Sequence, residues 1–446
     1  MGQANRAIVL GSGIAGLVTA RVLSAHFDEV IVIEKDSEPR EAGFRPGVPQ
    51  GHHFHALIPG GLEVMNRLMP GLKADLVEAG SILPKRDQFY FYLPEGKSYS
   101  QAMFQPEPPG EDLFEPAYVQ TRGLLEFTVR KRVMGLENVV FRYGTAVREP
   151  LVDAGRVTGV RVDKTDEAIP ADVVIDAMGK TGRTSAWLRA IGFAPPSANV
   201  INCDFAYTSV FLAPDDPSLF TDVGFFVAPA AGSAQFRGGA LVRMEDGSWL
   251  ALVGGRYGDY PPRDFSGFLD WAKTLSEPRF FDLVSRATPI GQPAHFRFPR
   301  GVRRRFDLLT EFPEGLLPVG DSVCHFNPAY GQGMTSASLQ AMALAQVLSK
   351  HGGWPDGLWH EAFAAMYQVT RAPWLFAATA DFMHPECTGD FPQEEMEALA
   401  ALGALRERAM TGDRQAYRQL MNVSMLKVPL SSILPATGGN AEVAVV

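Results

Sequence analysis

The stretch that decides the fold runs Ala7-Ile-Val-Leu-Gly-Ser-Gly-Ile-Ala-Gly-Leu17, a short apolar strand followed by a glycine-rich turn. Gly11 permits the tight turn, Gly13 lets the backbone approach a pyrophosphate, and Gly16 lets the next helix pack on the strand. We expect that helix over residues 14–24, with its N-terminal amides directed at the phosphates. The segment therefore predicts the first half of a dinucleotide-binding βαβ unit.

A second apolar run, Val30–Ile33, ends at an acidic residue. Glu34 follows Gly16 by 18 residues, where a carboxylate can accept hydrogen bonds from ribose hydroxyls. A glycine-rich turn in an ordinary βαβ unit is the alternative, but the order strand, turn, helix, strand and Glu favours dinucleotide binding. The expected contacts in this unit are Gly11, Ser12, Gly13, Ile14, Ala15, Gly16, Glu34 and Lys35.

The bulk composition narrows the class of protein. A chain of 446 residues suits two or three lobes, and 46% hydrophobic with 20% charged residues is typical of a soluble globular enzyme. A net charge of -9 argues against nucleic acid and anionic membranes as partners. The one basic cluster, Arg300 with Arg303–Arg305, is expected to be a solvated turn.

Cysteine usage and the ends of the chain bear on the compartment. The three cysteines lie far apart and have no metal-ligand spacing, so we expect no metal and a reducing compartment. The N-terminus has no signal-peptide pattern, and no apolar run reaches the length of a membrane-spanning helix. These features predict a cytoplasmic protein.

The order of patterns along the chain predicts an α/β fold in three parts. Helices are expected at 62–72, 124–133 and 331–348, and buried strands at 171–177 and 316–320 return to the first sheet. Strands are also expected at 139–147 and 157–162 with a hairpin between them, and antiparallel strands from 196 to 300. The predicted division is a discontinuous Rossmann-like dinucleotide domain (1–84, 119–195 and 301–350), a β-sheet substrate domain (85–118 and 196–300) and a helical C-terminal region (351–446).

A later strand and loop indicate whether the bound dinucleotide is FAD or NAD. Residues 316–334 read Leu-Leu-Pro-Val-Gly-Asp-Ser-Val-Cys-His-Phe-Asn-Pro-Ala-Tyr-Gly-Gln-Gly-Met. Asp321 can hold a sugar-alcohol hydroxyl, and the amides of Gly331–Met334 form a helix N-terminus. Such a site suits the electron-rich end of a reduced flavin, whereas an NAD site has no use for it.

This segment resembles the Gly-Asp motif of FAD-dependent monooxygenases of the para-hydroxybenzoate hydroxylase type, and the resemblance covers about residues 5–350. It implies a Rossmann-like FAD domain and an FAD cofactor. Arg45, 11 residues after Glu34, matches an arginine that contacts the FAD phosphates in that family. The FAD contacts that follow are Arg45, Gly47, Val48, Arg122, Val147, Asp321, Pro328, Gly331, Gln332, Gly333 and Met334.

Two further segments bear on the reaction: one resembles a subgroup of this family, and the other differs from the family's usual motif. Gly47-Val-Pro-Gln50 followed by His53-Phe-His55 looks like the subgroup that contains polyene epoxidases of polyether biosynthesis. The family usually has Asp-Gly where this chain has Asp176-Ala177. Electrons from NAD(P)H therefore reach the flavin either directly or through a separate flavin reductase.

The resemblance implies a C4a-hydroperoxyflavin that hydroxylates or epoxidises an apolar or aromatic group. The substrate is expected between the flavin and the antiparallel sheet, and it is a small molecule or a peptide. His55, His53 and Asn327 are the candidate catalytic residues, with structural packing as the alternative for each; His52 and His325 are open to the same two interpretations. The aromatic residues expected on the sheet are Phe205, Tyr207, Phe211, Phe225, Phe226, Phe236 and Trp249.

Four other functions stay open. One is hydroxylation of a protein- or peptide-bound tryptophan in cofactor biogenesis. Another is a flavin-dependent dehydrogenase or reductase that does not activate oxygen. A flavin-dependent halogenase shares the N-terminal pattern, but its Trp-x-Trp-x-Ile-Pro segment is missing here. The last is a flavoprotein without enzymatic activity.

Overall fold

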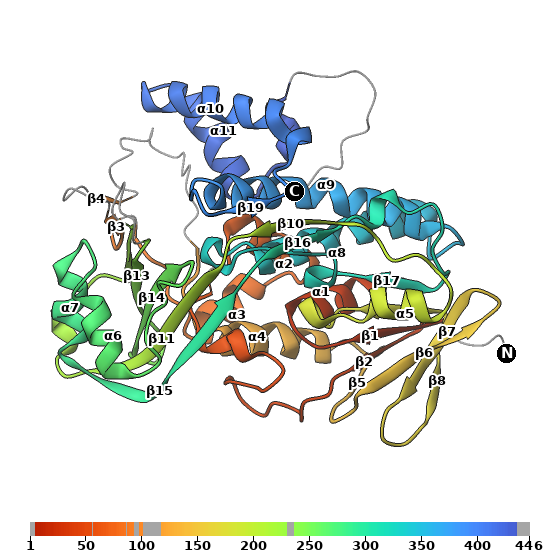
Figure 1. The fold of residues 1–446 in the computed structure, drawn as a ribbon. Helices are drawn as coiled ribbons and strands as arrows, with labels where there is room; N and C mark the ends of the chain where they lie inside the picture. The colour runs from red at the N-terminus through yellow and green to blue at the C-terminus, as the bar shows by residue number, and fades with distance from the viewer. Residues whose placement is uncertain are drawn as a thin grey trace.

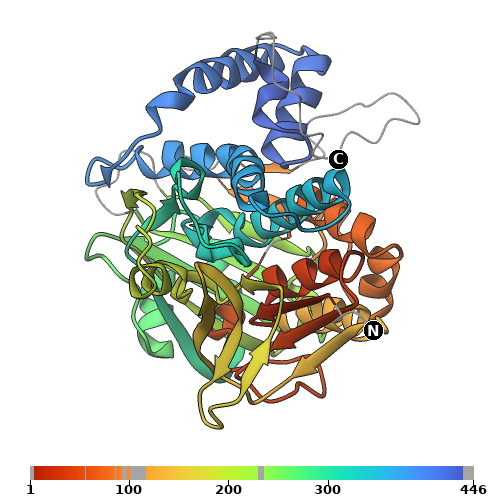
Figure 2. The ribbon, with the colours of Figure 1, turned by 90° about the vertical axis from the view of Figure 1, so that its right-hand side faces the viewer.

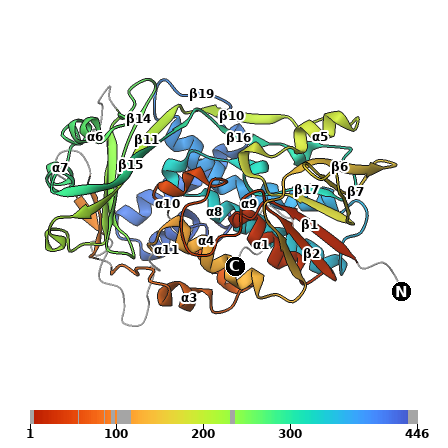
Figure 3. The ribbon, with the colours of Figure 1, turned by 90° about the horizontal axis from the view of Figure 1, so that it is seen from below.

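The computed structural model describes residues 5–55, 57–85, 87–92, 98–100, 117–229 and 236–434. Two sheets lie side by side, with long helices running across them (Figures 1 and 3). The parallel sheet has the order β17-β9-β1-β2-β5, and the larger, mostly antiparallel sheet has the order β15-β11-β14-β13-β12-β3-β4. The predicted substrate-domain segment 85–118 lies partly outside the described residues, as does the end of the predicted helical region, 435–446.

The parallel sheet forms because its strands are short, apolar and β-branched. Ala7–Leu10 and Val30–Ile33 are buried, and every pairing in this sheet is parallel, as expected where helices cover a sheet. Helix α1 (Ile14–Leu23) packs against the sheet and contacts both α4 (Arg122–Met134) and α8 (Gly333–His351). The strands are β1 (Arg6–Leu10), β2 (Glu29–Ile33), β5 (Val139–Arg142), β9 (Val173–Asp176) and β17 (Leu316–Pro318).

The larger sheet carries its own buried core, with α6 (Phe265–Ala272) and α7 (Pro278–Val284) packed against it. Its pairings are antiparallel except that β12 pairs with β3 in parallel. The antiparallel pairing predicted for residues 196–300 is therefore confirmed for β11 to β15, and the one parallel pairing is made with a strand from outside that region. The strands are β3 (Phe89–Tyr92), β4 (Ser98–Ser100), β11 (Phe205–Pro214), β12 (Gly224–Val227), β13 (Gly238–Arg243), β14 (Trp249–Arg256) and β15 (Ala287–Phe298).

Two smaller sheets complete the fold. One has the order β18-β16-β10-β19 and the other the order β6-β7-β8. The predicted strand 139–147 is wrong as a single element, because the chain turns at Gly144 (φ +63°) and continues as β6 in another sheet. The hairpin joins β6 to β7. The strands are β6 (Val147–Asp153), β7 (Arg156–Val162), β8 (Ala168–Pro170), β10 (Ala198–Asn202), β16 (Gly301–Arg304), β18 (Cys324–His325) and β19 (Thr388–Gly389).

Helices α10 and α11 form a layer beyond α9 (Figure 2). The predicted helix 62–72 is instead two helices, because Pro70 cannot continue a helix and Gly71 turns the chain at φ +92°. No helix in the described ranges is long and apolar enough to span a bilayer. The remaining helices are α1 (Ile14–Leu23), α2 (Pro59–Leu68), α3 (Leu72–Glu78), α4 (Arg122–Met134), α5 (Thr184–Ala190), α8 (Gly333–His351), α9 (Leu358–Asp381), α10 (Met396–Met410) and α11 (Arg414–Ser424).

Candidate functional site

A cavity of about 800 Å³ opens at the carboxyl ends of β1 and β2 and extends to the larger sheet. Ligands of open α/β sheets bind at this edge. The cavity gathers segments that are far apart in sequence. Of the predicted site residues it is lined by Gly11, Ser12, Gly13, Ile14, Ala15, Glu34, Lys35, Arg45, Gly47, Val48, His55, Arg122, Val147, Asp321, Asn327, Pro328, Gly331, Gln332, Gly333 and Met334.

The three glycines of the first turn have different surroundings. Gly11 adopts φ +94°, and a Cβ on it would lie 2.9 Å from the Ala177 carbonyl oxygen. A Cβ on Gly16 would lie 1.9 Å from the Gly11 carbonyl oxygen, so Gly16 serves the packing of α1 and does not line the cavity. A Cβ on Gly13 would meet no atom of the described residues within 4 Å. The space before Gly13 at the start of α1 therefore fits a pyrophosphate.

Glu34 lies between the glycine turn and the loop that carries Arg45. Its carboxylate accepts hydrogen bonds from the Ser12 amide at 2.9 Å, the Ser12 hydroxyl at 2.6 Å and the Arg45 guanidinium at 3.0 Å. Burial alone would raise the pKa of Glu34, but the Ser12 hydroxyl and the Arg45 charge hold it below its ordinary value. The side chain is thus an ionised acceptor beside the cavity, the state in which a carboxylate accepts from a ribose hydroxyl.

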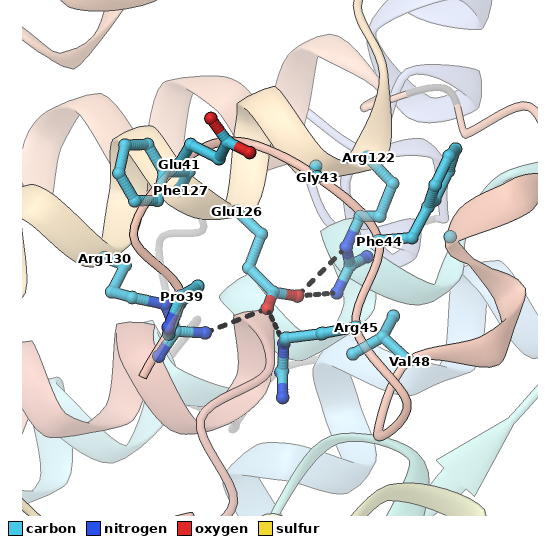
Figure 4. A pocket seen from close by; sticks show the side chains of 12 residues that line it. Pro39, Glu41, Gly43, Phe44, Arg45, Val48, Arg122, Glu126, Phe127 and Arg130 are labelled. Atoms are coloured by element: carbon cyan, nitrogen blue, oxygen red, sulfur yellow. Dashed lines mark hydrogen bonds and ion pairs between the residues drawn. The ribbon is translucent and has the colours of Figure 1, made fainter. Parts of the chain in front are cut away.

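Three arginines converge on the buried carboxylate of Glu126, as Figure 4 shows. Arg45 Nε lies 2.6 Å from Glu126 Oε1, Arg130 Nη2 lies 2.9 Å from the same oxygen, and Arg122 Nη2 lies 3.0 Å from Oε2. Arg130 also donates to the Ser12 carbonyl oxygen at 2.8 Å. The cluster therefore ties α4 to the glycine turn and fixes Arg45 and Arg122 at the wall of the cavity.

Glu126 and Arg130 are not among the site residues predicted from the sequence. A signal was available, because residues 122, 126 and 130 are spaced by four and so share one face of a helix. Arg130 is 1% exposed and Glu126 is 5% exposed. A buried Arg-x₃-Glu-x₃-Arg stripe is expected to have a structural partner, and here that partner is Arg45.

The far end of the cavity is built by the segment between β17 and α8. Gly320 adopts φ +64°, and its amide donates to Gln340 Oε1 at 2.8 Å, which directs Asp321 into the cavity wall. Burial raises the pKa of Asp321 to about 6, although Arg122, Lys180 and Arg304 oppose the shift. Gln332 Oε1 is buried and has no hydrogen-bond partner in the described structure. A ligand that donates hydrogen bonds, as ribityl hydroxyls and ring N–H groups do, fits this pair of acceptors.

Asp321→Asn is expected to stabilise the unliganded protein while weakening FAD binding by about tenfold, because an amide is a poorer acceptor than a carboxylate. Since the pKa of Asp321 in the fold is about 6, against an ordinary 3.8, ionisation opposes folding, and the cost grows from about pH 4 to about pH 7. Thermal melts across this range should show a variant advantage that increases with pH. An advantage independent of pH would contradict this explanation.

Of the predicted catalytic histidines, His53 is buried and His55 is half-buried, and both are neutral. Burial and the neighbouring His55 lower the pKa of His53 to about 3, and burial and the Arg122 charge lower that of His55 to about 4. His53 Nδ1 lies 2.8 Å from Ser209 Oγ, and His53 does not line the cavity. His55 Nδ1 donates to the His53 carbonyl oxygen at 2.8 Å, which leaves Nε2 as an acceptor. Neither ring is charged near neutral pH.

Asn327 lines the cavity, but its side chain is engaged within the protein. Its Oδ1 accepts from the Ala329 amide at 3.1 Å and its Nδ2 donates to Asp381 Oδ1 at 2.8 Å. The side chain is 1% exposed. These hydrogen bonds fix the conformation of the loop between β18 and α8.

The larger sheet gives the cavity an aromatic wall. Phe225 and Trp249 do not contribute, because side chains alternate along a strand and these two face the sheet's other core. Phe211 is also outside the cavity lining. The aromatic wall consists of Phe205, Tyr207, Phe226, Phe236, Phe296 and Phe298, on or next to this sheet; Phe54 and Phe326 also line the cavity but lie outside the sheet.

One curated relative spans most of the chain. Protein Rv3254 of Mycobacterium tuberculosis is 33% identical over 400 residues, which are 86% of this chain and 82% of the relative. The chain belongs to the family of Rv3254. No protein-family model matches the chain.

Solved structures share the fold of this Rv3254 relative. A triple mutant of the flavin-dependent brominase Bmp2 has a TM-score of 0.66 with 14% identity, over 95% of both chains. The tetrameric form of 2-methyl-3-hydroxypyridine-5-carboxylic acid oxygenase has a TM-score of 0.63 with 17% identity, over 95% of this chain and 96% of that one. The predicted fold, that of FAD-dependent monooxygenases of the para-hydroxybenzoate hydroxylase type, is confirmed. At these identities the likeness concerns the fold alone.

Proposed function

We propose that the protein is an FAD-dependent monooxygenase that hydroxylates or epoxidises an apolar or aromatic substrate group. One cavity runs from the open space at Gly13, past Asp321 and Gln332, to the aromatic wall, and this continuity carries the proposal. It lets the adenosine end of FAD lie at Glu34 and the ring end face the sheet. The family relationship and the shared fold are consistent with it.

A flavin bound here would supply the oxygen chemistry, and the residues of the cavity would supply binding, orientation and exclusion of water. The aromatic wall desolvates the reacting group of the substrate. Arg45 and Arg122 are fixed through Glu126. The neutral His55 offers Nε2 as a hydrogen-bond acceptor at the cavity, which suits a substrate hydroxyl better than proton delivery.

Reduced flavin in the protein should react with oxygen through a transient species. The test is rapid mixing of chemically reduced, FAD-loaded protein with oxygenated buffer, followed by absorbance. The proposal expects a short-lived near-UV band that differs from both oxidised and reduced FAD. A direct return to the oxidised spectrum would contradict it and favour a dehydrogenase or reductase.

We further propose that electrons come from NAD(P)H, either directly or through a flavin reductase, in the reducing environment of the cytoplasm. Cys203, Cys324 and Cys387 are free and buried, which agrees with that environment. Anaerobic mixing with NADH or NADPH separates the two routes, because only direct use bleaches the bound flavin. A bromide-dependent product would instead favour halogenation, and a peptide-bound tryptophan remains the alternative substrate.

A further inference from the structure

A buried polar cluster, Asp381 with Arg256, Asn327 and Tyr330, lies beside the cavity. Asp381 Oδ1 accepts hydrogen bonds from Arg256 Nη1 at 2.8 Å, Asn327 Nδ2 at 2.8 Å and the Tyr330 hydroxyl at 2.7 Å. The Tyr330 hydroxyl also accepts from Arg256 Nη2 at 3.0 Å. Each of the four comes from β14, α9 or the loop before α8.

This position is electrostatically unfavourable for a carboxylate. Asp381 is the last residue of α9, where the helix dipole opposes a negative charge. It is 2% exposed and Arg256 is 4% exposed, so both charges are desolvated. Arg256 Nε is buried and has no hydrogen-bond partner among the described residues. Buried ion pairs are weak sources of stability, which points to a geometric role for this one.

The cluster connects the two sides of the cavity. Residues 326–329 and 331–334 line it on one side, and Asn327 and Tyr330 anchor that loop to Asp381. On the other side, the Arg256 guanidinium lies 5.5 Å from the ring centre of Phe205 and 4.8 Å from that of Phe236, two members of the aromatic wall. A single carboxylate thus fixes the loop and the wall relative to each other.

We propose that Asp381 is a positioning residue that sets the distance between the flavin-binding loop 327–331 and the aromatic wall. The inference rests on the proposed function, because it assumes a flavin at that loop and a substrate at that wall. Asp381 itself does not line the cavity. It acts through Asn327 and Tyr330 on the loop, and through Arg256 on the rings.

The test uses Asp381→Asn and Tyr330→Phe in the full chain. Asp204 serves as the control, since it also accepts from a tyrosine hydroxyl (Tyr260, 2.6 Å) and an arginine (Arg297 Nε, 2.8 Å), but none of these residues lines the cavity. Asp204→Asn and Tyr260→Phe remove hydrogen bonds of the same kind at more exposed side chains, because Asp204 and Arg297 are 22% and 54% exposed against 3% and 2% for Asp381 and Arg256.

Two readouts decide the matter. Amide hydrogen exchange without FAD should show residues 329–331 exchanging faster by about tenfold or more in both cavity-side variants and unchanged in the controls. With saturating FAD, visible circular dichroism of the flavin should change in the same two variants only. If Asp381→Asn does not fold, Tyr330→Phe alone decides.

Unchanged exchange and an unchanged flavin spectrum in these variants would overturn the inference while leaving the proposed function intact. Wild-type protein that takes up no FAD would instead refute the proposed function, and the positioning role with it. Equal changes in the Asp204 and Tyr260 controls would show a general effect of lost hydrogen bonds, which also overturns the inference.

Discussion

Gly13→Val is expected to abolish FAD binding while leaving the fold unchanged. No atom in the described part of the chain lies within 4 Å of a Cβ at Gly13, and the backbone there is extended, so the protein itself accommodates the side chain. That space is where the pyrophosphate of FAD must approach the N-terminus of α1. A loss of affinity of at least about 100-fold, or about 3 kcal/mol, should follow.

The measurement is titration of the unliganded protein with FAD, followed by flavin fluorescence, beside a thermal melt. Gly403→Val is the matched control, because a Cβ at Gly403 also meets nothing within 4 Å but lies in α10, away from the cavity. Wild-type FAD affinity in Gly13→Val would show that the phosphates bind elsewhere. A large drop in the melting temperature of Gly13→Val would show that the folded protein has no room for a side chain at this position.

Glu126→Ala is expected to destabilise the protein by about 3–5 kcal/mol, because it leaves buried arginines without their shared carboxylate. Arg45 keeps Glu34 and Asp36 as partners, and Arg130 keeps Ser12. Arg122 has no other ion pair among the described residues. The free energy of unfolding in urea measures the loss, and FAD affinity should fall as Arg45 and Arg122 lose their fixed positions.

Glu63→Ala is the control for this change. Glu63 also pairs with a basic side chain, Lys73 at 2.9 Å, but about a third of its side chain is exposed. Its loss should alter stability by no more than about 0.5 kcal/mol. An equally small effect for Glu126→Ala would mean that the three-arginine cluster does not hold α4 to the glycine turn.

The parts of the fold that could be predicted from the sequence are local. The glycine turn, the apolar strands and Gly320-Asp321 each combine backbone conformation and hydrophobicity within a few residues, and the structure confirms these elements. The points where the chain ends one element and changes direction were harder to predict. The break at Pro70-Gly71 carries a local signal that a continuous helical pattern obscured, and the switch of sheet at Gly144 depends on which strand the next segment pairs with.

The parts of the site that could not be predicted depend on tertiary contacts. Alternation along a strand separates Phe225 from Phe226 but does not say which of them faces the cavity. Asp381 lies 54 residues after Asn327 in a helix without a motif, so only the packing of α9 reveals it. The histidines were sensible candidates by residue type, and only burial shows that they are neutral.

We propose that FAD occupies the cavity in front of Gly13. Purified protein mixed with excess FAD and passed through a desalting column should retain one flavin per chain, with a visible spectrum shifted from that of free FAD. Gly13→Val, treated in the same way, should elute colourless. Wild-type protein that elutes without flavin, or a variant that retains as much flavin as the wild type, would contradict FAD binding at this place.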